Sequence, residues 1–272
     1  MRANAPLRVG AAALLLASAL PAQRIWTITG LPGVLEENAA TGELLSAYPL
    51  PAPFVPFLAP VGDLSVDRAT GTLWVTDGMT VGRIARTGGP PIEAYPTPPP
   101  FGPLTGLAYD TTAGVPNLWL TDGLLIGNFG IGPAGLFPLA PAFFGPFPGL
   151  TGIDLDSSTG TLWVVDGLGV TANLAAIGGA VIGILPAPVG AFGPPFSGIA
   201  VDTSLPGGPL VPRVWLLAFG GVVNLLSGAV TTAYTFVGTT HEGIGWGPVP
   251  NRYGAGTAGP AGFLPEIDSA GG

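Results

Sequence analysis

A pattern built around Leu-Trp recurs along the chain, and this repetition constrains the fold more than any other feature. Close copies read ATGTLWVTDG at Ala69–Gly78, GVPNLWLTDG at Gly114–Gly123 and STGTLWVVDG at Ser158–Gly167. Successive tryptophans of the pattern lie 48, 45, 44 and 52 residues apart, and the aspartates that precede four of them lie 43, 46 and 46 residues apart. The tryptophans are Trp26, Trp74, Trp119, Trp163 and Trp215, and the aspartates are Asp67, Asp110, Asp156 and Asp202.

One repeat, read from Leu150, contains four short strands. Leu150–Asp156 leads into a tight turn in which Gly160 takes the left-handed position. Thr161–Asp166 alternates, is rich in β-branched residues and ends in an Asp-Gly turn. The segments 170–177 and 180–188 supply two more strands on either side of a Gly-Gly turn. Four strands in about 45 residues is the spacing of a β-propeller blade.

The ends of the repeat array complement each other. The Trp-containing strand occurs five times, but the first copy, Arg24–Gly30, has no strand before it. The strand that precedes it in the repeat also occurs five times, and the last copy, Gly243–Gly247, has no strand after it. We therefore predict an all-β, five-bladed propeller over residues 23–250, closed by pairing of these two strands, because closure removes free sheet edges. A six-bladed ring with one degenerate blade is the alternative.

Both termini differ from the repeats. Arg2 and Arg8 precede the apolar run Val9–Leu20, and small residues follow, which is the outline of a secretory signal peptide over residues 1–22. The run has 12 residues, too few to span a bilayer, so we predict cleavage and a secreted, periplasmic or extracellular protein; an uncleaved anchor is the alternative. Residues 251–272 form a Gly/Ala-rich tail that resembles the opening of a C-terminal segment of secreted bacterial proteins, which implies a chain cut inside a following domain.

Composition excludes several classes of partner. The eight basic residues are all arginine, and 16 acids give a net charge of −8, so nucleic acid and anionic membranes are not expected partners. The chain contains no cysteine, which excludes disulfides and thiolate metal sites. A hydrophobic content of 47% favours a packed core over disorder despite 45 glycines and 32 prolines. No stable membrane span is expected after signal cleavage.

The repeated polar and aromatic residues are interpreted as structural. Each Trp lies in mid-strand, where it is expected to pack between neighbouring sheets; a ring of sugar-stacking Trp is the alternative. The repeated Asp end a strand, where a carboxylate accepts hydrogen bonds from turn N–H groups. The same role is expected for the Asp-Gly turns at Asp77, Asp122 and Asp166, and a structural role for Asn128, Asn173 and Asn224.

Residues that stand just before the first strand of each repeat are candidates for a ligand site. In propellers this place points to the mouth of the channel, where ligands gather. Thr105, Thr151 and Ser197 hold it in three repeats and are candidate ligand-binding residues. Glu242 holds it in the last repeat and follows His241, the only histidine.

Two further acids break the repeat close to this place. Asp63 stands where the other repeats have Gly, and Asp154 replaces a small residue. Carboxylates that converge at a channel mouth bind Ca²⁺ or act as general acid and base; ordinary solvated acids are the alternative. The candidate catalytic residues are therefore Glu242, Asp63, Asp154 and His241, with Glu242 and Asp154 as candidate metal ligands and Ca²⁺ as the candidate cofactor.

The connections that precede each repeat are rich in Pro and Phe. If these Phe are exposed, they form an apolar surface of the kind that binds a partner; if they fold inward, they fill gaps between blades. The Phe of the connections are Phe54, Phe57, Phe101, Phe143, Phe144, Phe147, Phe192 and Phe196. Five of them are candidate ligand-binding residues: Phe143, Phe144, Phe147, Phe101 and Phe196.

The repeat G-[LI]-A-x-D…G-x-L-W-V-T-D-G resembles that of NHL, SMP-30-like and YncE-like propellers over most of the chain. The SMP-30-like resemblance implies a divalent metal held at the channel by a Glu, Asn and Asp set, for which Glu242 and Asp154 match by position. The related virginiamycin B lyase type depends on a histidine, for which His241 is the match. These resemblances bear on the fold more than on the activity.

Three functions follow from these observations. We favour a secreted, non-catalytic binding module for an extracellular protein or glycan, acting through the Pro/Phe-rich connections. The alternative is a metal-dependent, lactonase-like hydrolase or lyase at the channel mouth. A structural envelope protein is the third, and it predicts a homo-oligomer.

Overall fold

The computed structural model describes residues 23–29, 33–38, 44–54, 62–67, 69–112, 114–188, 194–202, 213–218, 221–226, 229–235, 241–248, 252–253 and 267–268, with the side chains of part of them. The predicted signal peptide, most of the predicted tail, Phe57 and Phe192 lie outside the described residues, as do the side chains of His241 and Glu242.

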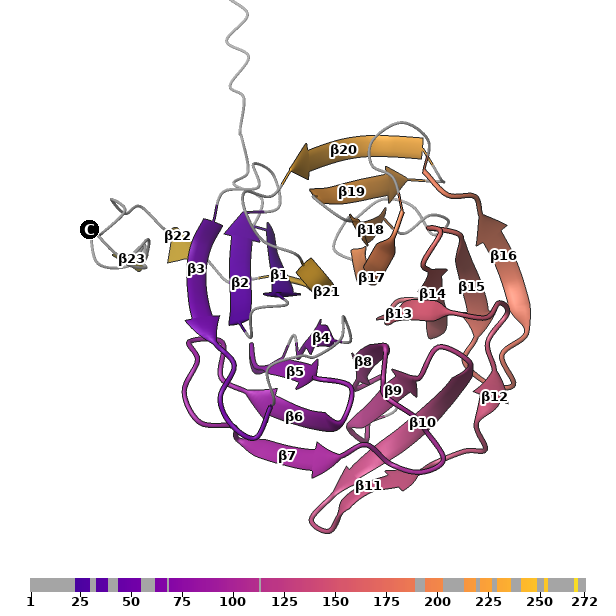
Figure 1. Ribbon diagram of the computed structural model, residues 1–272, viewed down its shortest axis with the longest axis horizontal. Coiled ribbons are helices and arrows are strands. Elements are labelled where there is room, and N and C mark those ends of the chain that lie inside the picture. Colours follow the sequence, from indigo (N-terminus) through magenta and orange to yellow (C-terminus); the bar gives the residue numbers. More distant parts are fainter. Residues whose placement is uncertain are drawn as a thin grey trace, which may run out of the picture.

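Five antiparallel sheets follow one another along the described chain (Figure 1). Sheet 1 has the order β21 (His241–Pro248), β1 (Gln23–Thr29), β2 (Gly33–Asn38), β3 (Leu44–Pro49). Sheet 2 contains β4 (Asp63–Val66), β5 (Leu73–Thr76), β6 (Thr80–Ile84) and β7 (Glu93–Pro96). Sheet 3 contains β8 (Gly106–Asp110), β9 (Asn117–Thr121), β10 (Leu125–Gly132) and β11 (Gly135–Pro138), and β12 (Phe143–Phe144) also pairs with β10.

The remaining sheets repeat this order. Sheet 4 contains β13 (Leu150–Asp156), β14 (Thr161–Asp166), β15 (Thr171–Ala175) and β16 (Val181–Leu185). Sheet 5 contains β17 (Phe196–Asp202), β18 (Arg213–Ala218), β19 (Gly221–Leu226) and β20 (Ala229–Thr235). Near the C-terminus β22 (Arg252–Tyr253) pairs with β23 (Ile267–Asp268). The prediction of an all-β chain built from repeated antiparallel sheets is confirmed.

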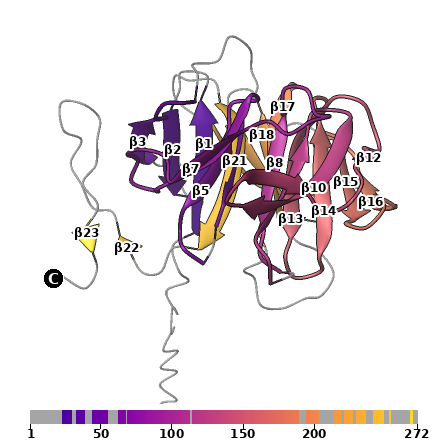
Figure 2. The same cartoon turned by 90° about the horizontal axis from the view of Figure 1, so that it is seen from below.

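The five sheets stand radially around a common centre, with the first strand of each repeat innermost (Figures 1 and 2). The inner strands contact one another in the order β4, β8, β13, β17, β21 and again β4. β21 completes sheet 1 because it pairs antiparallel with β1, with Trp26 opposite Gly245. The predicted pairing of the strand at 243–247 with the N-terminal strand is thereby confirmed.

The turns form for the reasons expected from the sequence. Gly160 has a φ of 69°, which a side chain rarely adopts. The Asp156 Oδ1 atom accepts a hydrogen bond from the Ser158 N–H at 2.9 Å, and Asp67 does the same for the Ala69 N–H. The Asp-Gly turns form in the same way, because the Asp166 Oδ1 atom accepts a hydrogen bond from the Leu168 N–H at 2.9 Å. The repeated Asp with described side chains are therefore turn residues.

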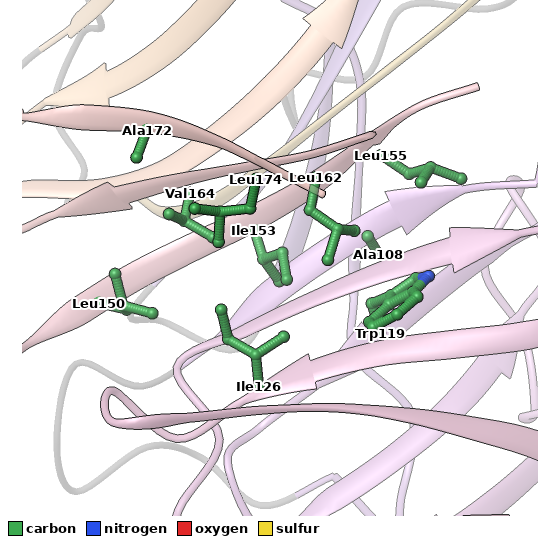
Figure 3. Close-up of a cluster of buried hydrophobic side chains, with 10 residues drawn as sticks. All are labelled: Ala108, Trp119, Ile126, Leu150, Ile153, Leu155, Leu162, Val164, Ala172 and Leu174. Atoms are coloured by element: carbon green, nitrogen blue, oxygen red, sulfur yellow. The ribbon is translucent and has the colours of Figure 1, made fainter. Parts of the chain in front are cut away.

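The repeated Trp form the core between neighbouring sheets. All five are buried, and clusters of apolar side chains join each of sheets 1 to 4 to the sheet that follows it. Figure 3 shows the cluster between sheets 3 and 4, where Trp119 lies at one end beside Ala108, and Ile126 of sheet 3 and the aliphatic residues of sheet 4 fill the rest. Burial in the core, and not a ring of exposed stacking surfaces, is the role of these Trp.

The inner strands of sheets 3, 4 and 5 approach one another so closely that glycine is needed between them. A Cβ atom added to Gly152 would lie 2.9 Å from the Gly198 Cα atom and 2.9 Å from the Ile199 backbone nitrogen. One added to Gly106 would lie 3.0 Å from the Ile153 backbone nitrogen. Real Cβ atoms essentially never stand this close to backbone, so these positions are fixed by backbone packing.

Candidate functional site

Asp63, a candidate catalytic residue, is fully buried and joins two sheets. Its Oδ1 atom accepts a hydrogen bond from the Leu64 N–H at 2.9 Å, and its Oδ2 atom accepts one from the Leu107 N–H at 2.9 Å. Leu64 belongs to β4 and Leu107 to β8, so the carboxylate links the inner strands of sheets 2 and 3. Its oxygens satisfy buried backbone donors and do not stand at a solvated rim.

Asp154 repeats this arrangement between sheets 4 and 5. Its Oδ1 atom accepts from the Leu155 N–H at 2.8 Å, and its Oδ2 atom accepts from the Val201 N–H at 2.7 Å. Ser65 completes the series, since its Oγ atom accepts from the Tyr109 N–H at 3.0 Å. Asp63 and Asp154, which break the repeat, therefore join neighbouring inner strands, and Ser65 does the same.

The expected metal site at Glu242 and Asp154 stays a prediction, because the Glu242 side chain lies outside the described ones. No group of three or more His, Cys, Asp or Glu suited to a metal ion occurs among the described residues. His241 and Glu242 begin β21, and their side chains are outside the described ones. The two acids that were to converge with them, Asp63 and Asp154, hold backbone N–H groups instead.

The hydroxyl candidates also contact backbone. Thr105 donates a hydrogen bond from Oγ1 to the Leu150 carbonyl at 2.8 Å, which ties sheet 3 to sheet 4. Thr151 donates to the Val165 carbonyl at 3.4 Å within its own sheet. Ser197 is half-buried at the start of β17. The hydrogen bonds of Thr105 and Thr151 therefore stabilise the inner ends of the sheets.

Three Phe of the connections fold inward. Phe54, Phe101 and Phe196 are buried members of the inter-sheet clusters, so the two candidates among them, Phe101 and Phe196, are core residues and not surface anchors. Each lies where a side chain is missing: a Cβ on Gly127 would meet the Phe101 ring at 2.9 Å, and one on Gly169 would meet the Phe196 ring at 2.6 Å. The sequence left inward packing open as an alternative, and the structure confirms it for these three rings.

The connection before sheet 4 behaves differently. Phe143 and Phe147 are half-buried against the cluster of Figure 3, whereas the Phe144 side chain is 78% exposed. β12 is formed by Phe143 and Phe144, which pair with Ile126 and Leu125 at the edge of β10. This short pairing holds two successive aromatic rings at the outer boundary between sheets 3 and 4.

A pocket of about 360 Å³ opens at this boundary. Its volume lies within the usual range for small-ligand sites, roughly 300–1,000 Å³. Trp119 forms part of its wall, with Phe143 and Asn128, and the turn before β16 supplies Ile177. The remaining lining residues are Ala140, Pro141, Ala142, Ala176 and Gly178. None of the lining residues carries a charge, so the pocket is suited to a neutral, largely apolar group.

The surroundings of Trp119 differ from those of Trp74 in the preceding repeat. Between sheets 2 and 3, the Arg83 guanidinium lies 5.8 Å from the Trp74 ring centroid, and Tyr109 stacks on the same Trp at 5.6 Å. Arg83 is paired across the strands with Trp74, and Asn128 holds the same place opposite Trp119. Asn also stands opposite Trp163 and Trp215, so Arg83 is the exception among these four repeats. The space beside Trp119 is bounded by Asn128 together with the connection at 140–143 and the turn at 176–178.

Two polar atoms of the pocket residues are buried without a hydrogen-bond partner among the described residues: the Trp119 Nε1 atom and the Asn128 Oδ1 atom. Trp119 is 5% exposed. The same indole nitrogen is also unpartnered in Trp26, Trp74 and Trp163. Trp119 therefore differs from these Trp by the cavity beside it and not by its unpartnered nitrogen. The Trp119 Nε1 and Asn128 Oδ1 atoms both have almost no exposed surface, and the Asn173 Oδ1 atom is unpartnered in the same way, so it is the apolar lining that the cavity offers to a ligand.

Sequence reasoning included Phe143 among the candidates but placed Trp119 and Asn128 with the structural residues. The repeat gave no signal at Asn128, because Asn128, Asn173 and Asn224 are alike at this position and Arg83 is the exception among these four repeats. Whether this position lines a pocket depends on the side chains that the next sheet places over the Trp, and these are known only once the sheets are packed together.

The place equivalent to the pocket between sheets 2 and 3 holds an ion pair. The Arg83 Nε atom lies 2.8 Å from the Glu93 Oε1 atom, and Tyr95 donates its hydroxyl to Glu93 Oε2 at 2.6 Å. Burial raises the pKa of Tyr95 to about 12, and the hydrogen bond to the Glu93 carboxylate acts in the same direction. The phenol is therefore held protonated in the folded chain.

This raised pKa predicts a loss of stability in alkali. Tyr95 ionises near pH 10 in the unfolded chain and near pH 12 in the folded one, so its contribution is complete below pH 10 and falls as the pH rises towards 12. We expect the urea midpoint to fall less between about pH 9 and about pH 11 in Tyr95→Phe than in the wild type. Equal losses in both proteins would contradict the prediction.

Comparisons with known proteins concern the fold. No family model matches the chain, and no curated protein matches it. A chain in the crystal structure of the nidogen/laminin complex is similar over 82% of this chain and 98% of its own length, at 15% identity and a TM-score of 0.54. A Bacteroides caccae protein of unknown function is similar over 84% of this chain and 99% of its own length, at 11% identity and a TM-score of 0.52.

These likenesses agree with a propeller-like arrangement of antiparallel four-stranded sheets. A propeller-like fold is therefore supported, and no family model confirms the expected NHL, SMP-30-like or YncE-like resemblance. Among the residues that the structure describes, no helix is long and apolar enough to cross a membrane.

Proposed function

We propose that this chain is an exported, five-bladed propeller that acts as a non-catalytic binding module, and that the pocket between sheets 3 and 4 receives an apolar side chain of a protein partner. The observation that carries the proposal is the pocket itself, because it combines an open apolar cavity, a half-buried Phe143 and a buried indole. Export rests on the signal-like pattern of residues 1–22. Five blades rest on the five radial sheets and on the pairing of β21 with β1.

The surroundings of the pocket favour a protein partner. The Ile177 side chain at the pocket is 94% exposed, and Phe144 follows Phe143 at 78% exposure. Large exposed apolar side chains beside a cavity are typical of protein-binding surfaces. A glycan requires many hydrogen-bonding side chains around its hydroxyl groups, whereas Asn128 and Trp119 are the pocket residues that bring polar side-chain atoms. The nidogen/laminin neighbour comes from a complex between proteins, which agrees with this choice.

The enzymatic alternative receives no support from a specific contact. Asp63 and Asp154 each use both carboxylate oxygens to accept backbone hydrogen bonds. A general base needs an oxygen within reach of a substrate proton, and a Ca²⁺ site needs several oxygens that point at one place. We therefore expect Ca²⁺ and EDTA to leave the thermal midpoint unchanged.

Selection from a phage-displayed library of random linear peptides tests the binding function. We expect the selected peptides to share an aromatic or aliphatic anchor and to bind the protein directly in isothermal titration. Filling the pocket with Ala140→Phe, at an exposed lining residue, should weaken binding at least about tenfold, which corresponds to ~1.4 kcal/mol. Phe144→Ser should weaken it as well.

Leu168→Ser is the matched control. Leu168 is an exposed apolar residue in the turn between β14 and β15, and it does not line the pocket. This variant should bind the selected peptides with unchanged affinity. Peptides that bind Ala140→Phe and the wild type equally well would refute the assignment of the pocket.

A further inference from the structure

Charge is absent from two long stretches that form most of sheets 3 and 4. Residues 123–153 contain no Asp, Glu, Lys, Arg or His, and neither do residues 167–201. The first stretch contains β10, β11 and β12, and the second contains β15 and β16. The outer strands of both sheets are therefore uncharged in a chain whose net charge is −8.

β16 is an outer strand with an unprotected edge. It ends the order β13-β14-β15-β16, and among the described residues only β15 pairs with it. Its sequence is Val-Ile-Gly-Ile-Leu, with Ile182 61% and Ile184 57% exposed. Exposed edges are normally blunted by charged side chains, Pro or shortening, and β16 has neither a charge nor a Pro within its five residues.

Other outer strands carry such protection. β7 contains Glu93 and Pro96, and β11 has four residues and ends at Pro138. β3 ends at Pro49. Among the outer strands of four or more residues whose side chains the structure describes, β16 is the one that has neither a charge nor a Pro.

We propose that two copies of this chain associate through β16, which pairs antiparallel with the β16 strand of the second copy about a two-fold axis at Gly183. The strand is self-complementary in this register, because Val181 stands opposite Leu185 and Ile182 opposite Ile184 of the other copy. An edge-to-edge contact of this kind satisfies the open backbone groups and uses the same surface on both copies. The proposal is independent of the ligand in the pocket.

Electrostatics favour this edge over the rest of the surface for a contact between two copies. Two chains of net charge −8 repel each other over most of their surfaces, and this repulsion is smallest where neither chain carries a charge. An added Cβ on Gly183 would meet no atom within 4 Å, so the face of the sheet is open at the proposed axis.

Sedimentation over a concentration series tests the association with the purified full chain. We expect the wild type to sediment as a dimer that dissociates on dilution. The double variant Ile182→Lys/Ile184→Lys should sediment as a monomer at concentrations at least a hundredfold higher, because it brings four positive charges together at the axis. Met79→Lys/Val115→Lys adds the same two charges per chain at exposed residues in turns outside sheet 4 and should still dimerise.

A cysteine variant gives an independent measurement. The chain has no cysteine, so Gly183→Cys introduces a single thiol at the axis. Directly opposed residues of antiparallel strands have Cα atoms about 4.5–5.5 Å apart, within the range of a disulfide. Mild oxidation should therefore convert Gly183→Cys into a covalent dimer, while Val115→Cys stays monomeric under denaturing electrophoresis.

Two results would overturn the proposal. One is a wild type that remains monomeric at every concentration, including a wild type that binds neutral lipid vesicles instead. The other is a dimer that persists in Ile182→Lys/Ile184→Lys with no cross-linking of Gly183→Cys. Peptide binding in the pocket is measured separately, so failure of either proposal leaves the other in place.

Discussion

Replacing Asp63 with alanine is expected to lower the free energy of unfolding by roughly 2–6 kcal/mol, because two buried N–H groups would each lose their acceptor at a cost of about 1–3 kcal/mol. These donors are the Leu64 and Leu107 N–H groups, both held at 2.9 Å. Equilibrium urea unfolding followed by Trp fluorescence measures the loss. No water replaces the carboxylate easily, since Asp63 is fully buried between two inner strands.

Asp166→Ala is the matched control for this effect. Its carboxylate also accepts two backbone hydrogen bonds, from the Leu168 and Val170 N–H groups, both at 2.9 Å. That turn is partly open to solvent, so water can take over the donors, and a loss of about 1 kcal/mol or less is expected. Equal losses in the two variants would show that the link between sheets is not what Asp63 provides. An Asp63→Ala protein of unchanged stability that loses Ca²⁺ binding would restore the catalytic interpretation.

Gly152→Ala is expected to destabilise the protein by about 2–3 kcal/mol, the cost of a methyl group forced into packed atoms. The new Cβ would lie 2.9 Å from the Gly198 Cα atom, and this neighbour is backbone of the adjacent inner strand. A flexible side chain moves aside at little cost, but a paired strand cannot shift without disturbing its sheet. The same urea experiment measures the difference.

Gly167→Ala provides the comparison within the same sheet. Its added Cβ would lie 3.8 Å from the Thr151 Cγ2 atom, an ordinary contact distance, and Gly167 does not have a positive φ. Its stability should change by about 0.5 kcal/mol or less. A Gly152→Ala protein as stable as Gly167→Ala would mean that the inner strands separate freely.

The parts of the fold that sequence predicted are those that depend on local pattern. The strand Leu150–Asp156, its turn at Gly160 and the buried Trp163 follow from alternation, turn chemistry and hydrophobicity within a few residues. The pairing of β21 with β1 followed from counting strands, because an incomplete unit at each end left one consistent solution. Repetition made a non-local contact predictable.

The parts that sequence missed depend on what the neighbouring repeat supplies. Asp63 differs from its counterparts in other repeats, which marked it as a candidate for chemistry, yet its partner is the Leu107 N–H of the next sheet. The sequence allowed a surface or a core position for Phe101 with equal reason. In the structure its ring lies in the space over Gly127, which has no side chain. The pocket at Trp119 is lined by residues of two sheets and of the connection between them, and no single residue of the repeat marks it.

The pairing between β1 and β21 also orders the events of folding. The strand that completes the first sheet lies at residues 241–248, more than 200 residues after its partner, so this sheet stays incomplete until nearly the whole chain has emerged. Joining such distant segments has a large entropic cost before any contact compensates for it. Sheets 2 to 5 are each formed from consecutive strands and are available early. We therefore expect the meeting of the two ends of the array to be a late step of assembly, and a chain interrupted before β21 to keep the edge of β1 open.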